Sequence, residues 1–287
     1  MKHALLIVAH KQFEILIKML KTLDHEDIDF FIHIDKKCQK YPKHEIEQAC
    51  SYSNVHFIKR QNVHWGGYSQ IRCTLSLLSN AISNNYDYYH LLSGQDFPIK
   101  KKQQFLEFFN QNAGIEYVHF MEKEIEDRHL DRIRYHWFSM DGAKKWEKIT
   151  EIEKRIGYNR FENNEIQTFY MGSNWFSITH EFAQYLLSKE KWIHKTFRHS
   201  ALGDELFVQT LLMNGPFQNR LSENNFIYDS TSCMRKIHFN EQGKPYVFQT
   251  KDFNDLIQSP CLFARKFDLD IDSEIIDRLF EYLKNSK

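Results

Sequence analysis

Apolar residues in the first part of the chain form short continuous runs that alternate with runs spaced by three and four residues. The short runs Ala4–Ala9, Phe30–Ile34 and Tyr88–Leu92 predict buried strands, because polar or turn residues bound each of them. Between the first two, Phe13–Leu23 carries apolar residues at helical spacing. A strand, a helix and a strand in this order predict a βαβ unit and hence a parallel sheet.

The same alternation continues to about residue 115. It predicts helices at Glu45–Ser51, Gln70–Ala81 and Lys101–Gln111, and a further strand at Val55–Ile58. Four strands connected in this way indicate a Rossmann-like half that spans residues 1–115.

The second half, residues 116–287, has a weaker pattern, and residues 122–146 are first charge-dense and then aromatic without a clear period. Because no repeat, linker or low-complexity tract separates the halves, we expect residues 1–287 to form one α/β domain with a mainly parallel central sheet flanked by helices. The expected elements of this half are strands at Glu116–Met121 and Tyr170–Ile178 and helices at Thr179–Ser188, with Thr179 as N-cap, Glu205–Met213 and Ser273–Leu283.

Composition removes several classes of protein. Lysine plus arginine equals aspartate plus glutamate at 38 each, so no overall charge favours nucleic acid. No run of 18 apolar residues predicts a transmembrane segment, and the N-terminal apolar run is too short for a signal peptide. Five scattered cysteines without a CxxC pair argue against a disulfide framework and a structural zinc site, and favour a reducing compartment.

Polar residues that follow the predicted strands are the first candidates for chemistry. Gly94 and Asp96 follow the strand at Tyr88, and His10 and Asp35 follow the first two strands. Ligands of open α/β sheets bind beyond the carboxyl ends of strands, and a carboxylate after the second strand often holds a ribose or base. The alternatives are an ordinary turn in which Asp96 caps a nearby group, and a surface Asp35 flanked by solvated lysines. No GxGxxG motif or P-loop is present.

Two further clusters combine acidic or basic residues with apolar neighbours. Asp204 opens a predicted helix and is read as its N-cap, whereas Glu205 has no such duty and suits a general base. Arg265 and Lys266 lie between phenylalanines, and fixed cations suit a diphosphate leaving group. The alternating aspartates at 268, 270 and 272 are either Mg²⁺ or Mn²⁺ ligands or acids that precede the last helix.

A resemblance to a known family extends through almost the whole chain. The family is that of the core-2/I-branching β-1,6-N-acetylglucosaminyltransferases and peptide O-xylosyltransferases. The resemblance implies a GT-A-like glycosyltransferase fold, a UDP-sugar donor, inversion at the anomeric carbon, and no metal or other cofactor. The matching segments are, in order, ALLIVAH, FFIHIDKK, HWGGYSQIRC, YDYYHLLSGQDFPIK, YMGSNWFSITHEF, GDELFVQTLL and LFARKFD.

The resemblance also implies roles for individual residues. Glu205 would be the catalytic base, and Lys266 would bind the diphosphate together with a second basic residue. Lys244 is the nearest candidate for that second residue, with Arg235 and Lys236 as alternatives. Donor-site positions are Val8, His10, Asp35, Trp65, Gly66, Ser69, Asp96, Lys244, Arg265 and Lys266, and acceptor-site positions are Arg132, Arg134, Tyr135, Trp175, which would stack on a sugar, and Asp204.

The chain lacks the membrane anchor, stem and disulfide set of animal members, and so resembles a bacterial relative. We therefore expect a cytoplasmic protein, or one in peripheral contact with the inner face of the membrane. It would transfer N-acetylglucosamine or xylose to a glycan or lipid-linked saccharide in surface-glycan biosynthesis, with no nucleic-acid partner. The rival hypotheses are a metal-dependent GT-A enzyme that uses Asp96 or the aspartates at 268–272, and a non-catalytic module that binds a UDP-sugar or glycan.

Overall fold

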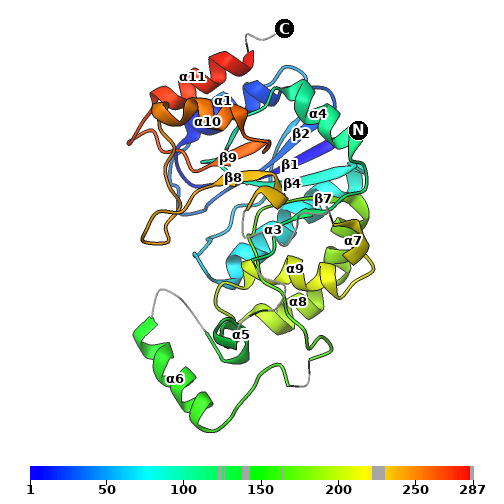
Figure 1. The fold of residues 1–287 in the computed structure, drawn as a ribbon, viewed down its shortest axis with the longest axis vertical. Helices are drawn as coiled ribbons and strands as arrows, with labels where there is room; N and C mark the ends of the chain where they lie inside the picture. Colours follow the sequence, from blue (N-terminus) through cyan, green and yellow to red (C-terminus); the bar gives the residue numbers. More distant parts are fainter. Residues whose placement is uncertain (122–124, 126, 138–142, 163, 222–229, 285–287) are drawn as a thin grey trace.

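The computed structural model describes residues 1–121, 125, 127–137, 143–162, 164–221 and 230–284. Its centre is a six-stranded sheet in the order β3-β2-β1-β4-β7-β6 (Figure 1). The first four of these strands are parallel to one another, as predicted for this part of the chain. β7 pairs antiparallel with β4, and β6 pairs antiparallel with β7. The strands are β1 (His3–Ala9), β2 (Ile28–Ile34), β3 (Val55–Phe57), β4 (Tyr88–Ser93), β7 (Phe176–Thr179) and β6 (Tyr117–Val118).

Side chains of the sheet alternate between two apolar cores, as the two-residue period of a strand requires. Leu5 and Ile7 of β1 face one core, whereas Ala4 and Leu6 face the other. Helices cover both faces, so the molecule has the predicted α/β architecture with a flanked, mainly parallel sheet (Figure 1). The first core is built with α1 (Phe13–Leu23), α2 (Lys43–Glu47), α4 (Lys102–Gln111), α10 (Phe253–Gln258) and α11 (Glu274–Lys284), and the second with α3 (Tyr68–Ala81), α7 (His180–Ser188), α8 (Glu190–Phe197) and α9 (Phe207–Met213).

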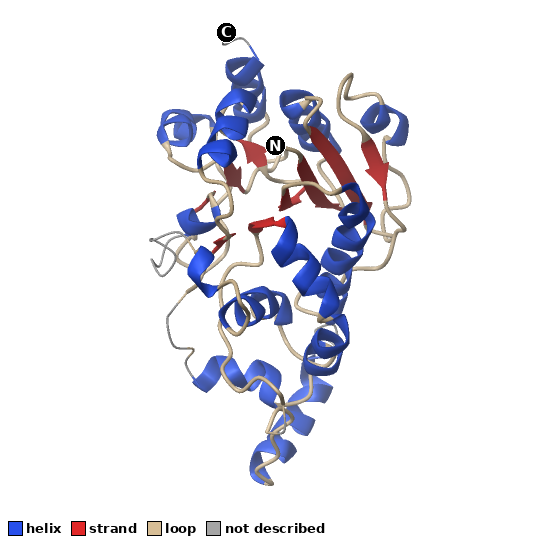
Figure 2. Cartoon of the chain, turned by 90° about the vertical axis from the view of Figure 1, so that its right-hand side faces the viewer, coloured by secondary structure: helices blue, strands red, loops and turns tan. Residues whose placement is uncertain are grey.

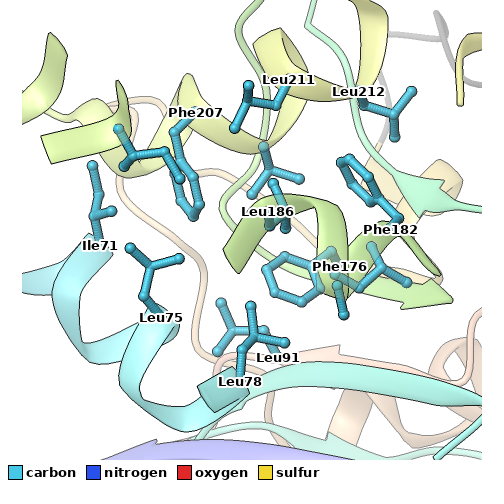
Figure 3. Packing of buried hydrophobic residues seen from close by; sticks show 14 of the residues in the cluster. Ile71, Leu75, Leu78, Leu91, Phe176, Phe182, Leu186, Phe207, Leu211 and Leu212 are labelled. Carbon is cyan, nitrogen blue, oxygen red and sulfur yellow. The ribbon is translucent and has the colours of Figure 1, made fainter. Parts of the chain in front are cut away.

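The second core fixes the elements that carry the acidic residues. Figure 3 shows Ile71, Leu75 and Leu78 of α3 pointing toward side chains of α7, α9, β4 and β7. Burial of a large apolar side chain of this kind contributes ~1.5–3 kcal/mol. Because α3 and α9 share this core, the segments that enter the two helices are held beside each other.

A small second sheet joins the C-terminal segment to the turn after β4. Its strands are β5 (Phe97–Pro98), β9 (Phe263–Arg265) and β8 (Arg235–Ile237), in the order β5-β9-β8. The backbone N–H of Phe267 also donates a hydrogen bond to the carbonyl oxygen of Gln95, at 3.0 Å. These contacts place Arg265 and Lys266 near the turn that follows the carboxyl end of β4, although about 170 residues separate them from β4 in sequence.

Two expected elements differ at the places that later matter for the site. The strand expected from Tyr170 begins only at Phe176, because the N–H of Gly172 bonds to the carbonyl of Glu205 rather than to a neighbouring strand. The helix expected from Glu205 begins at Phe207, and Gly203–Glu205 (η3) is a short 3₁₀ turn. Glu205 therefore does not lie in an α-helix.

The acceptor region expected at 122–146 is only partly described, since residues 122–124, 126 and 138–142 lie outside the described residues. The chain there includes α5 (Asp127–Arg134), and α6 (Ala143–Arg155) follows. Both helices lie at one end of the molecule, beyond α8 and α9 (Figures 1 and 2). None of the described helices is long and apolar enough to cross a membrane.

Candidate active site

Glu205 ends the η3 turn with its carboxylate partly open to solvent. The side chain is 36% exposed, and the backbone carbonyl accepts a hydrogen bond from the N–H of Gly172 at 2.9 Å. Leu202, just before the turn, has a left-handed backbone with φ of 51°. A non-glycine residue in this region is strained, and such strain is often found at functional sites. The backbone therefore holds Glu205 in a fixed position with its acid group accessible.

Arg132 of α5 forms an ion pair with Glu205, with 2.7 Å between Nη1 and Oε2. Burial raises the pKa of Glu205, and the positive charge and hydrogen bond of Arg132 act in the opposite direction. Arg134 and Tyr135, which were also expected at the acceptor site, have different neighbours: Arg134 pairs with Asp131, and Tyr135 lies under the ammonium group of Lys154. Of these three residues, the structure brings Arg132 to the predicted base.

Asp204 lies behind Glu205 in the protein interior. One carboxylate oxygen, Oδ2, accepts a hydrogen bond from Nε2 of Gln70 at 3.1 Å, and the buried Oδ1 has no partner among the described residues. Burial and the charge of Glu205 raise the pKa of Asp204 to about 7. The carboxylate does not cap α9, so the N-cap interpretation is wrong. Its predicted acceptor role stays a prediction, and the buried side chain offers an acceptor little surface.

The loop before α3 is fastened to this acidic turn. Gly66 has a φ of 70°, which glycine adopts without strain, and its carbonyl accepts a hydrogen bond from the N–H of Leu202 at 2.8 Å. Gln70 accepts a hydrogen bond from the N–H of Gly66 while it donates to Asp204. The hydroxyl of Ser69 closes the loop by accepting a hydrogen bond from the N–H of His64. The side chain of Trp65 in this loop is 70% exposed. The predicted donor loop and the predicted base therefore belong to one hydrogen-bonded unit.

Arg265 is held by two groups beneath the surface. Its Nε lies 3.5 Å from Oδ1 of Asp96, and its guanidinium lies 4.0 Å from the ring centre of Trp175. Asp96 is buried and accepts hydrogen bonds from the backbone and the hydroxyl of Ser93. The alternative in which Asp96 caps a nearby group therefore agrees with the structure. Its role in binding the UDP-sugar stays a prediction, and the buried carboxylate offers that ligand little surface. The arginine covers one face of the Trp175 indole, which was expected to stack on a sugar.

The segment from Gly172 to Trp175 connects the acidic and the basic side of the site. Gly172 bonds to the backbone of Glu205, and Trp175 packs against Arg265. A Cβ atom at position 172 would lie 1.8 Å from the carbonyl oxygen of His119, so only glycine fits there. The close backbone contact thus gives a physical reason for the glycine of the GSNW sequence, which lies between Glu205 and Arg265 in the structure.

The carboxyl ends of β1 and β2 carry three predicted site residues. His10 and Asp35 directly follow these strands, and Val8 is the next-to-last residue of β1. β1 and β2 are neighbours, with Ala9 opposite Ile34. Asp35 is buried and accepts hydrogen bonds from the N–H groups of Lys37 and Val63, at 2.8 and 3.3 Å. The interpretation of Asp35 as a solvated surface residue is therefore wrong. Burial, and next the charge of Lys11, lower the pKa of His10, whereas Asp35 acts in the opposite direction.

The three candidates for the second basic residue at the diphosphate, named above, are each exposed or engaged with groups other than Lys266. Lys244 lies on an exposed turn, where its N–H donates to Oδ1 of Asn240. Arg235 is buried and donates to three backbone carbonyls and to the hydroxyl of Ser177, and Lys236 pairs with Asp255. The charges that act on Lys266 come instead from Lys11, Arg265 and Asp268.

Lys11 is a charged residue near the end of β1 to which the sequence analysis gave no role. Its ammonium group lies 2.9 Å from Oδ2 of Asp268, and its positive charge lowers the pKa of Lys266. Asp268 is distant in sequence, so this ion pair could not be predicted from the pattern.

The aspartates at 268–272 have structural partners. Asp268 binds Lys11 and Gln12, and Asp272 accepts a hydrogen bond from the N–H of Ile275 in the first turn of α11, at 3.0 Å. The interpretation of Asp272 as a cap for the last helix is confirmed. Within the described part of the chain, no group of three histidine, cysteine, aspartate or glutamate residues is arranged to hold a metal ion.

Comparison with sequence families gives a match to the Core-2/I-Branching enzyme family over residues 4–256. Among curated proteins, rat xylosyltransferase 2 is 25% identical over 305 residues, with 98% of this chain and 33% of the relative covered. Human xylosyltransferase 1 is 26% identical over 301 residues, with 97% and 30% covered. The chain spans about a third of the length of these relatives.

Solved structures give weaker likenesses. The apo form of mouse xyloside xylosyltransferase 1 is 10% identical with a TM-score of 0.35, covering 75% of this chain and 83% of the other. Core-mannan synthase A from Aspergillus fumigatus, in its Mn/GDP form, is 13% identical with a TM-score of 0.37, covering 73% and 69%. TM-scores this low carry no argument about function.

Proposed function

Because the chain belongs to the core-2/I-branching enzyme family, we propose that it is a glycosyltransferase that moves a sugar from a UDP-sugar to an acceptor hydroxyl, with inversion and without a metal ion. The observation that carries this proposal is the position of Glu205. Its carboxylate is accessible, its backbone is anchored to Gly172, and the segment 172–175 connects it to the guanidinium of Arg265, the residue before Lys266.

In the proposed reaction, Glu205 removes the proton of the acceptor hydroxyl. The oxygen then attacks the anomeric carbon from the face opposite the diphosphate, and the bond between that carbon and the phosphate oxygen breaks. Its electrons leave with UDP, and the proton stays on Glu205. A single displacement inverts the anomeric centre and needs only one base. Lys266 provides a fixed positive charge near the leaving group, which lowers the barrier as charge develops.

The donor and acceptor are proposed in outline. N-acetylglucosamine is favoured by the family, and xylose by the names of the similar curated proteins. The acceptor would be a glycan or lipid-linked saccharide of a bacterial surface polymer. The reaction would then take place in the cytoplasm, with the inner face of the membrane as the alternative location.

The decisive experiment is the substitution Glu205→Gln. It keeps the size of the side chain but removes the proton acceptor, so transfer should fall by ~10²–10⁴-fold. The rate is measured as UDP release with a panel of UDP-sugars and acceptors, and UDP binding is measured by calorimetry as the control, because the substitution should leave it unchanged. Near-normal turnover of the variant would reject Glu205 as the base.

Two rival functions are separated by the same assay. A metal-dependent enzyme would lose all activity in EDTA and regain it with Mn²⁺, whereas the proposed enzyme keeps its rate. A binding module would bind UDP in the wild type and release none from any donor.

A further inference from the structure

The last turn of α5 carries Arg132, the partner of the proposed base, and is held by a residue from outside the helix. The last carbonyls of an α-helix have no partner within it. In α5 two of them bind Arg160, which lies in the turn after α6. Its N–H donates to the carbonyl of Arg134 at 3.0 Å, and its Nη1 donates to that of Ile133 at 3.3 Å. Nη1 also donates to the carbonyl of Tyr135, just after the helix, at 3.2 Å.

The same guanidinium also binds the end of α8. Nη1 donates to the carbonyl of His199 at 2.8 Å, and Nη2 donates to that of Thr196 at 3.3 Å. The N–H of Trp137 donates to the same His199 carbonyl at 2.8 Å, so the two segments meet here. A positive charge is favourable at both helix ends, because the helix dipole is negative there. Among the described residues, the hydrogen-bond partners of the Arg160 guanidinium are all backbone carbonyls.

The segment that leaves α8 leads directly to the acidic turn. The N–H of Ala201 in this segment donates to the carbonyl of Arg132 at 2.9 Å. The side chain of Arg132 then reaches Glu205, with 2.7 Å between Nη1 and Oε2. Arg132 is therefore fixed through both its backbone and its guanidinium. Because Arg160 binds the chain on both sides of this contact, it sets the distance between the end of α5 and the acidic turn.

Arg132 from α5 and Asp204 from η3 are the charged groups that face Glu205 among the described residues. The charge that opposes the effect of burial on the pKa of Glu205 is that of Arg132. We propose that Arg160 is a positioning residue of the transfer reaction, which holds the end of α5 against the segment 196–201 so that the guanidinium of Arg132 stays on the carboxylate of Glu205. The inference rests on the proposed function and deepens it, because it assigns what keeps the base and Arg132 together.

The test compares the pH dependence of kcat/KM for the wild type and Arg160→Gln. The rate is measured as UDP release from pH 5 to 9, with the donor and acceptor that react fastest in the panel described above. A glutamine amide cannot donate to both helix ends, so Arg132 loses its position and the pKa of Glu205 rises. The acidic limb should move up by about half a unit to one unit, and kcat/KM below that pKa should fall by about threefold to tenfold.

Arg198→Gln is the matched control. Arg198 is an exposed arginine that follows the last residue of α8, so its replacement removes the same charge from the same region without removing these hydrogen bonds. The acidic limb of this variant should stay at the wild-type pH. A limb that moves equally in both variants would show that the loss of charge, and not the position of Arg132, changes the base, and would overturn the inference.

The double variant Arg132→Gln/Arg160→Gln separates positioning from an independent effect. If Arg160 acts through Arg132, the limb of the double variant coincides with that of Arg132→Gln alone, and additive shifts would overturn the inference. An unmoved limb together with a lower Tm in Arg160→Gln is the result expected of a merely structural residue, and it would also overturn the inference. Arg160→Lys carries the same test if the glutamine variant does not fold, because a compact ammonium group cannot replace the planar fork that spans both helix ends.

Failure of this inference can be distinguished from failure of the proposed function. If Arg132→Gln moves the limb and Arg160→Gln does not, only the role of Arg160 is refuted. If Glu205→Gln keeps its turnover, the assignment of the base is wrong, and the positioning role of Arg160 is refuted with it.

Discussion

The guanidinium of Arg132 lies 2.7 Å from the proposed base and determines how easily that base gives up its proton. Burial alone would leave Glu205 protonated at higher pH, because a desolvated carboxylate is unfavourable. A base must be ionised to act, so activity is present above the pKa of Glu205 and lost as pH falls through it. Arg132 therefore extends activity toward lower pH, in addition to any contact it makes with the acceptor.

Replacing Arg132 by glutamine should move the acidic limb of the kcat/KM profile to higher pH. The opposing charge is lost while burial remains, so the pKa of Glu205 rises. At pH values below that pKa, kcat/KM should fall by about tenfold for each unit that the limb moves. The profile is measured from pH 5 to 9. Arg132→Lys keeps the charge and should keep most of the limb in place. An unshifted limb in the glutamine variant would mean that Arg132 does not control the base.

The sequence predicted the roles of some site residues and not of others. Glu205 and Lys266 were found through the order of the motifs, because each lies in a segment with a specific pattern. Arg132 was placed with the acceptor, and only the structure brings it to Glu205. Lys11 had no pattern of its own, since its significance comes from a neighbour about 250 residues away. The assigned roles of the site residues stay predictions until such variants are measured.

At the scale of elements, the segment from Gly172 to Trp175 replaces the start of an expected strand. Its backbone passes so close to His119 that it cannot accept a side chain, and it uses the freed N–H to hold Glu205. The strand predicted for this stretch is confirmed from Phe176 onward. The prediction failed before Phe176 because an apolar pattern does not reveal the close contact between the backbones of Gly172 and His119.

Gly172→Ala should therefore damage both stability and catalysis. The added carbon would meet a backbone oxygen, which must shift, so we expect a loss of ~1–3 kcal/mol in the free energy of unfolding. The kcat should fall as well, because the carbonyl of Glu205 loses its donor. Denaturant unfolding and UDP release measure the two effects. Gly114→Ala is the comparison, since its Cβ would meet no atom within 4 Å and only the positive φ is strained.

At the scale of the whole molecule, the buried Asp204 makes stability depend on pH. Its pKa is raised from 3.8 to about 7, so the folded protein holds a proton that the unfolded chain releases. The corresponding stability is fully present below about pH 4 and is lost as pH rises through about 7. At ~1.4 kcal/mol per pKa unit the upper limit of this change is ~4 kcal/mol.

Asp204→Asn should remove this dependence, because an amide does not titrate. The melting temperature of the variant relative to the wild type should rise between pH 4 and 8 and then level off, at ~2–4 °C for each kcal/mol. Glu116, whose pKa burial also raises to about 7, is present in both proteins and cancels in the difference. A difference that stays constant across this range would show that Asp204 is ionised throughout.

The sequence by itself determined the α/β class, the parallel pairing of the first strands and the family, because these depend on local periods and on short segments in a fixed order. The boundaries of most long helices and strands followed from the same local signals. The partners of the charged groups were decided only by the tertiary structure: Arg132 with Glu205, Asp96 with Arg265, and Lys11 with Asp268. Each pair joins segments that are distant along the chain, and an ion pair or a shared site depends on distances of a few ångströms, which only the packing of the two cores sets.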